Sequence, residues 1–402
     1  GYKNSPLGII PNEWEVKRLG EISQMFSGGT PKSTEQMYFN GEIPFIKSGE
    51  ISNAKTEQYL SESGLKNSSA KLIERGDLLY ALYGATSGEC ALSKISGAIN
   101  QAILCIRPTK DVDRYFLLSF LQKGKEYYYN SYLQGGQGNL SADIVKGYKI
   151  LTPPLPEQRK IAEVLSTWDR AIEKQMLLVE KLELRKKGLM QQLLTGKKRL
   201  PGFSEEWKKV KLGDIAKRIV RKNNIECSNV VTISAQKGFV RQTDFFNKKI
   251  ASETVENYYL VKRDEFCYNK SYCNGFPMGA IKRLKEFDQA VVTTLYICFS
   301  IQPERASLDF IEQYFSLGLL NRGLMKIANE GGRAHGLLNV TPNDFFNTEL
   351  MLPPFDEQKA ISSILLNAHE EVIFAKSKLE FLRKEKKGLM QVLLTGKKRV
   401  RL

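Results

Sequence analysis

The sequence has few of the residues that metal sites and many nucleases need. Only two histidines occur, His335 and His369, and the six cysteines include no Cys-x-x-Cys pair. This set argues against a zinc or histidine-based nuclease centre and predicts reduced thiols, as in a cytosolic protein. We interpret His369 as a solvated residue on the outer side of a helix.

Phosphate-binding loops are also missing. No Gly-x-Gly-x-x-Gly or Gly-x-x-x-x-Gly-Lys-Ser/Thr segment occurs, which argues against nucleotide-driven motors and Rossmann-type cofactor sites. There is no Asn-Pro-Pro-Tyr or Asp-Pro-Pro-Tyr segment of the kind that amino-methyltransferases use. No run of about 18 uncharged apolar residues and no signal pattern is present. We therefore expect a soluble, cytoplasmic protein, not bound to a membrane, that holds no metal or cofactor.

Basic residues, in contrast, are abundant. The chain has 60 Lys and Arg against 44 Asp and Glu, a formal net charge of +16 over 402 residues. This balance favours an anionic partner, and nucleic acid ranks ahead of an acidic membrane surface. The alternative is a basic surface that serves only solubility.

A long segment occurs twice. Residues 153–199 and 353–399 align without a gap at an offset of 200, and their last 14 positions differ only at Gln192 and Val392. The domain openings repeat as well, because Glu13-Trp14 is matched by Glu206-Trp207. A repeat of this spacing predicts two domains, each followed by a helix.

Each repeat carries an apolar seam with alternating steps of four and three residues, the pattern of a coiled coil. The seam positions are Ile161, Leu165, Trp168, Ile172, Gln175, Val179, Leu182, Lys186, Leu189 and Leu193, and the residues 200 positions later. Since one copy alone cannot bury such a stripe, we favour an antiparallel pair of helices within the chain. A coiled coil between two chains is the alternative.

The segments between each domain opening and the long helix that follows it are predicted to contain both strands and helices. Short strands are expected at 43–46, 78–82 and 99–106 in the first domain, and at 230–233, 265–268 and 291–301 in the second. Helices are expected at 115–128 and 310–320, with helix starts at Ser141 and Thr341-Pro342. The predicted fold class is α+β: two mixed α/β domains separated by two long antiparallel coiled-coil helices, with an internal pseudo-twofold repeat.

Double-stranded DNA is bound by cations at phosphates and by amide, guanidinium or hydroxyl groups at base edges. The loops offer such groups in both domains. The DNA-binding candidates are Thr30, Lys32, Lys47, Ser48, Tyr83, Thr86, Asn100, Gln101 and Gln137 in the first domain, and Lys237, Arg241, Asn269, Lys270, Ser271, Tyr272, Arg333 and His335 in the second.

Several motifs carry a family resemblance. They are the two domain openings, the entries Pro-Pro-Leu-Pro-Glu-Gln at 153–158 and Pro-Pro-Phe-Asp-Glu-Gln at 353–358, and the helix ends Gly-Leu-Met-Gln-x-Leu-Leu-Thr-Gly. Together these motifs extend over the whole chain, and in them it resembles the specificity subunit of a type I restriction-modification system. Residues 43–51 and 76–101 also resemble strands of the recognition domains of that family. The strand at 290–296 matches the family only loosely.

The resemblance implies target recognition domains at 1–152 and 201–352, each reading one half of a bipartite DNA site, with spacer helices at 153–200 and 353–402. It implies that the chain is not an enzyme and that catalysis lies in partners, namely two methyltransferase subunits and restriction subunits. S-adenosylmethionine, ATP and Mg would be bound by those partners. The partner-binding candidates are Glu157, Gln158, Gly188, Leu189, Gln191, Glu357, Gln358, Gly388, Leu389 and Gln391.

Three alternatives stay open at this point. A nuclease with a degenerate carboxylate centre would show metal-dependent cleavage by this chain alone. A coiled-coil scaffold would bind proteins and show no salt-sensitive DNA binding. A stand-alone DNA-binding protein would work without restriction partners.

Overall fold

The chain folds into two compact units that are described separately. The computed structural model describes residues 1–132, 140–225, 227–243, 255–271, 275–328 and 338–401. Unit 1 comprises Gly1–Leu177 and Lys376–Leu402, and unit 2 comprises Leu178–Ala375. The boundary between them falls within both long helices, α4 (Leu155–Leu193) and α10 (Phe355–Leu393).

Unit 1 contains two four-stranded sheets, ordered β4-β11-β8-β9 and β6-β5-β10-β7. Its helices are α1 (Glu62–Lys66), α2 (Arg114–Tyr132) and α3 (Ala142–Lys146). Its strands are β1 (Tyr2–Ser5), β2 (Gly8–Pro11), β3 (Glu15–Arg18), β4 (Ser23–Ser27), β5 (Ile43–Ile46), β6 (Gln58–Leu60), β7 (Lys71–Ile73), β8 (Leu78–Ala81), β9 (Cys90–Leu92), β10 (Gly97–Ile99), β11 (Ile103–Pro108) and β12 (Lys149–Thr152).

Unit 2 repeats this plan: its sheet β14-β21-β18-β19 corresponds to β4-β11-β8-β9, and the pair β13-β22 corresponds to β3-β12. Its helices are α5 (Leu212–Ile215), α7 (Leu308–Ser316), α8 (Asn321–Ile327) and α9 (Pro342–Phe346). Its strands are β13 (Lys208–Lys211), β14 (Ala216–Ile219), β15 (Val231–Ser234), β16 (Gly238–Arg241), β17 (Tyr259–Lys262), β18 (Phe266–Asn269), β19 (Ala280–Arg283), β20 (Gln289–Val292), β21 (Ile297–Ile301) and β22 (Glu349–Leu352). The α+β class is confirmed.

Two of the expected strands were wrong in the same way. Segment 99–106 is split between β10 and β11, and segment 291–301 is split between β20 and β21, with each pair lying in different sheets. Side chains make the turns in between, because Asn100 Oδ1 accepts from the amide of Ala102 and Thr293 Oγ1 accepts from the amide of Leu295. Both segments therefore cross from one sheet to the next.

The helix starts at Ser141 and Thr341 are confirmed. The Ser141 hydroxyl accepts a hydrogen bond from the Ile144 amide, and the Thr341 hydroxyl accepts one from the Asp344 amide. These are N-caps, which satisfy backbone donors that a helix start leaves free.

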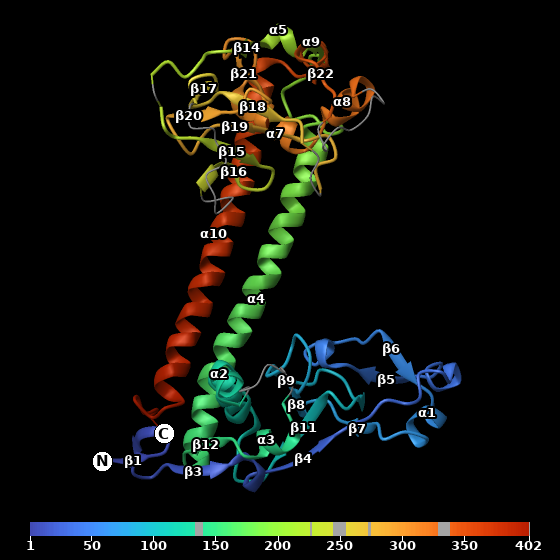
Figure 1. Cartoon of the computed structure of the whole chain (residues 1–402), viewed down its shortest axis with the longest axis vertical. Helices are drawn as coiled ribbons and strands as arrows, with labels where there is room; N and C mark the ends of the chain where they lie inside the picture. The colour runs from blue at the N-terminus through green and yellow to red at the C-terminus, as the bar shows by residue number, and fades with distance from the viewer. Residues whose placement is uncertain (133–139, 226, 244–254, 272–274, 329–337, 402) are drawn as a thin grey trace. The chain divides into compact units, whose positions relative to one another are not determined.

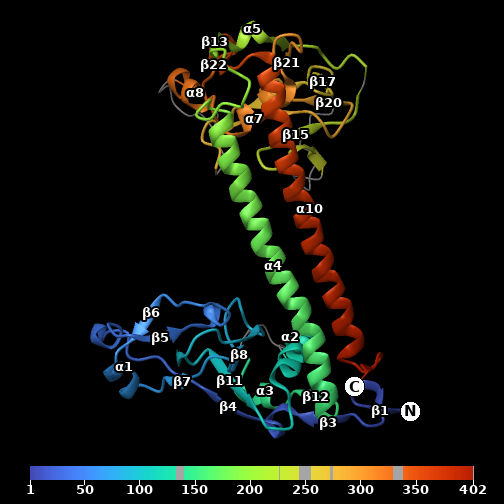
Figure 2. The same cartoon turned by 180° about the vertical axis from the view of Figure 1, so that it is seen from behind.

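In each unit, a part of α4 packs antiparallel against a part of α10 (Figures 1 and 2). Within unit 1, Asp169 Oδ1 lies 2.6 Å from Lys386 Nζ, and Leu393 and Leu394 join the core around Ile161. Within unit 2, Arg185 pairs with Glu371, and Leu193 and Leu194 join the core around Ile361. All twenty predicted seam positions are buried or half-buried.

A buried glutamate ties together three segments of unit 1. Glu157, 1% exposed, lies at the start of α4 and accepts hydrogen bonds from Trp14 Nε1 at 3.0 Å and from Arg399 Nε and Nη2 at 2.6 and 2.9 Å. Trp14 belongs to the opening of the chain, and Arg399 to the tail after α10. We call this arrangement the latch of unit 1.

Unit 2 has the same latch with the two helices exchanged. Glu357, at the start of α10, accepts from Arg199 Nε and Nη2 at 2.7 and 2.8 Å and from Trp207 Nε1 at 3.2 Å. Here the arginine lies in the tail after α4. The latch therefore explains why Glu-Trp, Pro-Pro-x-x-Glu-Gln and Gly-Lys-Lys-Arg all occur twice.

The turn that leads into the latch needs glycine. Gly196 and Gly396 follow the two long helices with φ of +67° and +71°, a left-handed conformation that favours residues without a Cβ. A Cβ on Gly396 would also lie 2.4 Å from Pro11 Cδ. Each tail thus turns back onto the opening of its unit.

Asp169 and His369 mark a difference between the two copies in the contacts between the long helices. Asp169 of unit 1 corresponds to His369 of unit 2, whose Nδ1 lies 3.0 Å from Lys186 Nζ. His369 is exposed, as the sequence indicated, and it nevertheless contacts the opposite helix. Partial burial lowers the pKa of His369, as do Lys186 and then Lys285, while Glu312 and Glu370 raise it.

Loss of the latch arginine should destabilise unit 1. In the Arg399→Ala variant, Glu157 keeps its charge in a buried position with only Trp14 as partner, which we expect to lower the free energy of unfolding by about 3 kcal/mol. Urea denaturation followed by tryptophan fluorescence measures this. Arg401→Ala is the matched control, because Arg401 is exposed. Equal stability of the two variants would contradict a role of the latch in holding unit 1 together.

The pH dependence of unit 2 should follow His369. Since its folded pKa is lowered, the unfolded chain takes up the proton first as the pH falls below about 6.5, so stability is lost between pH 7 and 5. His369→Asp should restore the ion pair seen in unit 1, add about 0.5 kcal/mol at pH 7 and remove this loss. His369→Asn should remove the loss of stability at low pH without adding stability at pH 7. Thermal melts at pH 7 and pH 5.5 test both, and an unchanged slope in His369→Asp would rule the idea out.

Candidate nucleic-acid interface

A polar pocket in unit 1 collects several of the predicted DNA-binding residues. It has a volume of about 440 Å³ and lies where η2 (Gln36–Tyr38), β5, β6 and the turn after β10 meet. Its lining residues are Thr30, Ser33, Gln36, Phe39, Asn40, Phe45, Lys47, Gln58 and Asn100. Four of them are carboxamides, one is a cation and none is acidic.

Two glycines position the edge of this pocket. A Cβ on Gly28 would lie 1.8 Å from the carbonyl oxygen of Ile99, and one on Gly29 would lie 2.6 Å from Ser69 Oγ. Only glycine allows this close approach of the loop to β10, and the loop then carries Thr30, whose hydroxyl bonds Gln101 Oε1 at 2.6 Å. Gly28 and Gly29 thus have a packing role inside the fold.

Some of the other candidates of unit 1 are close to pocket residues in the sequence, and others belong to the second sheet. Lys32 is exposed on the same loop as Thr30, and Ser48 is half-buried next to Lys47 at the start of η3 (Ser48–Glu50). Tyr83 and Thr86 lie between β8 and β9, which belong to the other sheet, and Tyr83 packs against the core. The structure therefore groups Thr30, Lys47, Asn100 and Gln101, and not Tyr83 or Thr86.

In unit 2, three neighbouring candidates, Asn269, Lys270 and Ser271, form hydrogen bonds within the chain. The Asn269 amide NH₂ donates to the Ile233 carbonyl at 3.4 Å, and its Oδ1 accepts from the Ser271 amide at 3.0 Å. Lys270 Nζ donates to the Val340 carbonyl at 3.3 Å, and burial lowers its pKa. These three residues stabilise the loop after β18, which makes them weaker candidates for direct DNA contact.

Lys237 directly precedes the hairpin strand β16, and Arg241 is the last residue of that strand. Lys237 is exposed before the strand, while the Arg241 guanidinium lies 5.7 Å from the centre of the Phe287 ring. Four further candidates, Gln137, Tyr272, Arg333 and His335, lie outside the described residues.

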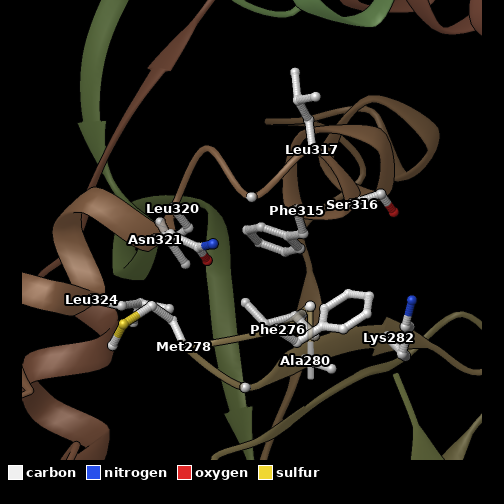
Figure 3. Close-up of a pocket in the computed structure, with 14 residues that line it drawn as sticks. Phe276, Met278, Ala280, Lys282, Phe315, Ser316, Leu317, Leu320, Asn321 and Leu324 are labelled. Carbon is white, nitrogen blue, oxygen red and sulfur yellow. The ribbon is translucent and has the colours of Figure 1, made fainter. Parts of the chain in front are cut away.

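A second pocket, in unit 2, has a different character (Figure 3). It lies between β19 and the segment that joins α7 to α8, and Phe276, Met278, Phe315 and Asn321 point toward it. Its lining contains none of the predicted DNA-binding residues. Most of its lining side chains are apolar, and the polar ones are Lys282, Ser316 and Asn321.

The predicted partner residues separate into two groups. Glu157, Gln158, Glu357 and Gln358 are at most 2% exposed, and their polar atoms bond within the chain. The Gln158 Oε1 accepts from the Asp113 amide just before α2, and Gln358 Oε1 accepts from the Ser307 amide just before α7. We therefore revise the prediction for these four: they hold the segments before α2 and α7 on the long helices, and their side chains are too buried to contact a partner.

The second group lies at the ends of the long helices. Gln191, Gln391 and Gly388 are exposed and Gly188 is half-buried, while Leu189 and Leu389 pack partly against the cores. A Cβ on Gly188 or Gly388 would meet no atom within 4 Å, so neither glycine is required by packing within the chain. The fold leaves these two identical glycines unexplained.

Four polar pocket residues escaped the sequence analysis, namely Ser33, Gln36, Asn40 and Gln58. They lie on separate segments, and only the pairing of β5 with β6 and β10 brings Gln58 near Asn100. A weak signal was available, since three of the four are carboxamides within 23 residues of one another. Among the described residues, no group of three or more His, Cys, Asp or Glu side chains could hold a metal, and no helix is long and apolar enough to span a membrane.

Comparisons with known proteins point to one family. The model of the "Type I restriction modification DNA specificity domain" matches residues 11–181. The MjaVIII specificity subunit of a type I restriction enzyme from Methanocaldococcus jannaschii is 22% identical over 98% of this chain and 94% of its own length. The MjaIX specificity subunit of the same organism is 24% identical over 99% of this chain and 96% of its own length.

A solved structure shows the same fold. The S subunit of the type I restriction-modification system of M. genitalium superposes with a TM-score of 0.58 over 97% of this chain and 98% of its own, at 14% sequence identity. At this identity the likeness concerns the fold.

Proposed function

The family-model match and the end-to-end similarity place the chain in the family of type I restriction-modification specificity subunits, and we propose that each of its units reads one half of a bipartite, asymmetric DNA site. Subunits of this family recognise DNA and leave catalysis to their partners. The observation that carries the proposal is that one strand plan occurs twice, with a pocket lined by four carboxamides in unit 1 and a pocket lined mainly by aliphatic and aromatic side chains in unit 2. Two domains with the same strand plan but with differently lined pockets are suited to bind two half-sites of different sequence.

In this proposal, the recognition domains are residues 1–152 and 201–352, and residues 153–200 and 353–402 form the spacer. The net charge of +16 supports it, because phosphate contacts supply much of the affinity of DNA-binding proteins. Thr30, Lys32, Lys47, Ser48, Asn100 and Gln101 of unit 1, and Lys237 and Arg241 of unit 2, are the candidates whose positions suit contact with DNA. The complex would act in the cytoplasm, where its DNA lies.

We assign the docking of two methyltransferase subunits to the repeated helix ends. Two copies of one partner need two equivalent surfaces, and residues 186–199 and 386–399 differ at a single position. Gly188 with Gln191, and Gly388 with Gln391, are among the identical residues there that the fold itself does not use. Restriction subunits would join through the methyltransferases, and S-adenosylmethionine, ATP and Mg would be bound by these partners.

The spacing of the half-sites should depend on the length of the long helices. Both α4 and α10 have 39 residues, and we propose that they set a separation of about one turn of duplex. Selection of binding sites from random duplex DNA should yield two unlike half-sites with a fixed gap. Deleting residues 171–177 and 371–377 together removes about 10 Å of helix, so the gap should shorten by about three base pairs with both half-sites unchanged.

Insertion of seven residues at the same places is the reciprocal control and should lengthen the gap by the same amount. An unchanged gap in both variants would rule out the helices as a spacer. Failure of the unaltered chain to select any sequence, or binding that does not weaken with salt, would contradict the proposed function itself.

The two helix glycines provide a test of partner docking. Gly188→Ala and Gly388→Ala should each raise stability by about 1 kcal/mol, because nothing in the chain opposes a Cβ there. Gly188→Leu and Gly388→Leu should instead each remove one methyltransferase subunit from the co-purified complex, and the double variant should remove both. The subunit ratio is measured by native mass spectrometry. Ser377→Leu, at an exposed position of α10 outside the repeated end, is the control, and full occupancy in the double Leu variant would contradict the assignment.

A further inference from the structure

We propose that the polar pocket of unit 1 is the site where one half-site is read, and that its carboxamides select an A·T base pair. This inference rests on the proposed function and adds the base that is recognised. It also names the residues that determine it: Gln36, Asn40, Gln58 and Asn100.

The chemistry of the lining selects among the bases. A carboxamide presents a donor and an acceptor side by side, which match N7 and the N6 amino group of adenine in the major groove. Cytosine is read by a carboxylate that accepts from its N4 amino group, and no acidic residue lines the pocket. Guanine is read by Arg or Lys, and Lys47 is the one cation among the lining residues.

The carboxamides are available for such contacts. Gln36, Asn40 and Gln58 are exposed, and among the described residues their side chains bond no other group of the chain. Asn100 uses its Oδ1 for the turn to Ala102, which leaves its NH₂ group as a donor. An unused donor and acceptor pair is therefore present at three points of the pocket.

The apolar part of the pocket suits thymine. Phe45 is buried and Phe39 is half-buried, and their rings meet edge to face with centroids 6.4 Å apart. An apolar surface beside carboxamides can contact the C5 methyl group of the thymine that pairs with the adenine. Lys32, which is exposed on the loop before the pocket, is placed to contact phosphate, and such contacts add affinity without sequence preference.

The test is selection from a random-sequence duplex library with the whole chain and its Gln36→Leu and Gln58→Leu variants. Each variant should lose its preference for A·T at one or two positions of one half-site, by roughly 5- to 150-fold, while the other half-site and the gap stay unchanged. Gln24→Leu is the matched control, because Gln24 is an exposed glutamine of β4 outside the pocket. Thermal melts of all variants should agree with the unaltered chain.

A gain of specificity complements this loss. Gln58→Glu places a carboxylate in the pocket and should change the preferred base at the affected position from adenine to cytosine, a result that misfolding cannot produce. An unaltered motif in all three pocket variants, or a loss that affects both half-sites equally, would overturn the inference while leaving the bipartite site in place. If the unaltered chain selects no bipartite motif, the proposed function fails together with it.

Discussion

The buried carboxylate at the start of each long helix is the interaction on which the rest of the structure depends. Glu157 and Glu357 are almost completely removed from water, so each must be compensated by a cation and by a further donor. The arginine comes from the tail of the opposite helix and the indole from the opening of the unit. One charged group thereby aligns a domain, a helix start and a helix end.

The residues that are identical in the two copies of the repeat are of two kinds. Those of the first kind form the unit itself: the latch residues, the glutamines that bond the amides before α2 and α7, and the glycines after the long helices. Those of the second kind, such as Gly188 and Gly388, have no contact in the chain that requires them. Only this second group is informative about partners, and the structure is needed to distinguish it from the first.

Much of the framework could be predicted from the sequence, because helix periodicity and caps are local properties. The seam of α4 and α10 and the caps at Ser141 and Thr341 follow from spacing alone. The sheet crossings were missed because two short apolar strands joined by a brief turn resemble one longer strand. The pocket could not be foreseen in full, since pairing between β5, β6 and β10 brings its carboxamides together. Glu157 and Gln158 were assigned to a partner because repetition alone does not reveal burial.

Unit 1 is assembled from two segments that are far apart in the sequence and are separated by the whole of unit 2. Residues 178–375 of unit 2 are continuous, whereas the core of unit 1 includes Leu393 and Leu394, and its latch includes Arg399. On the ribosome, residues 1–177 therefore emerge before unit 2, and their core can close only after residues 376–402 have been made. Unit 2, although translated later, can complete its fold first. The domain made first is the one most in need of protection from aggregation during synthesis.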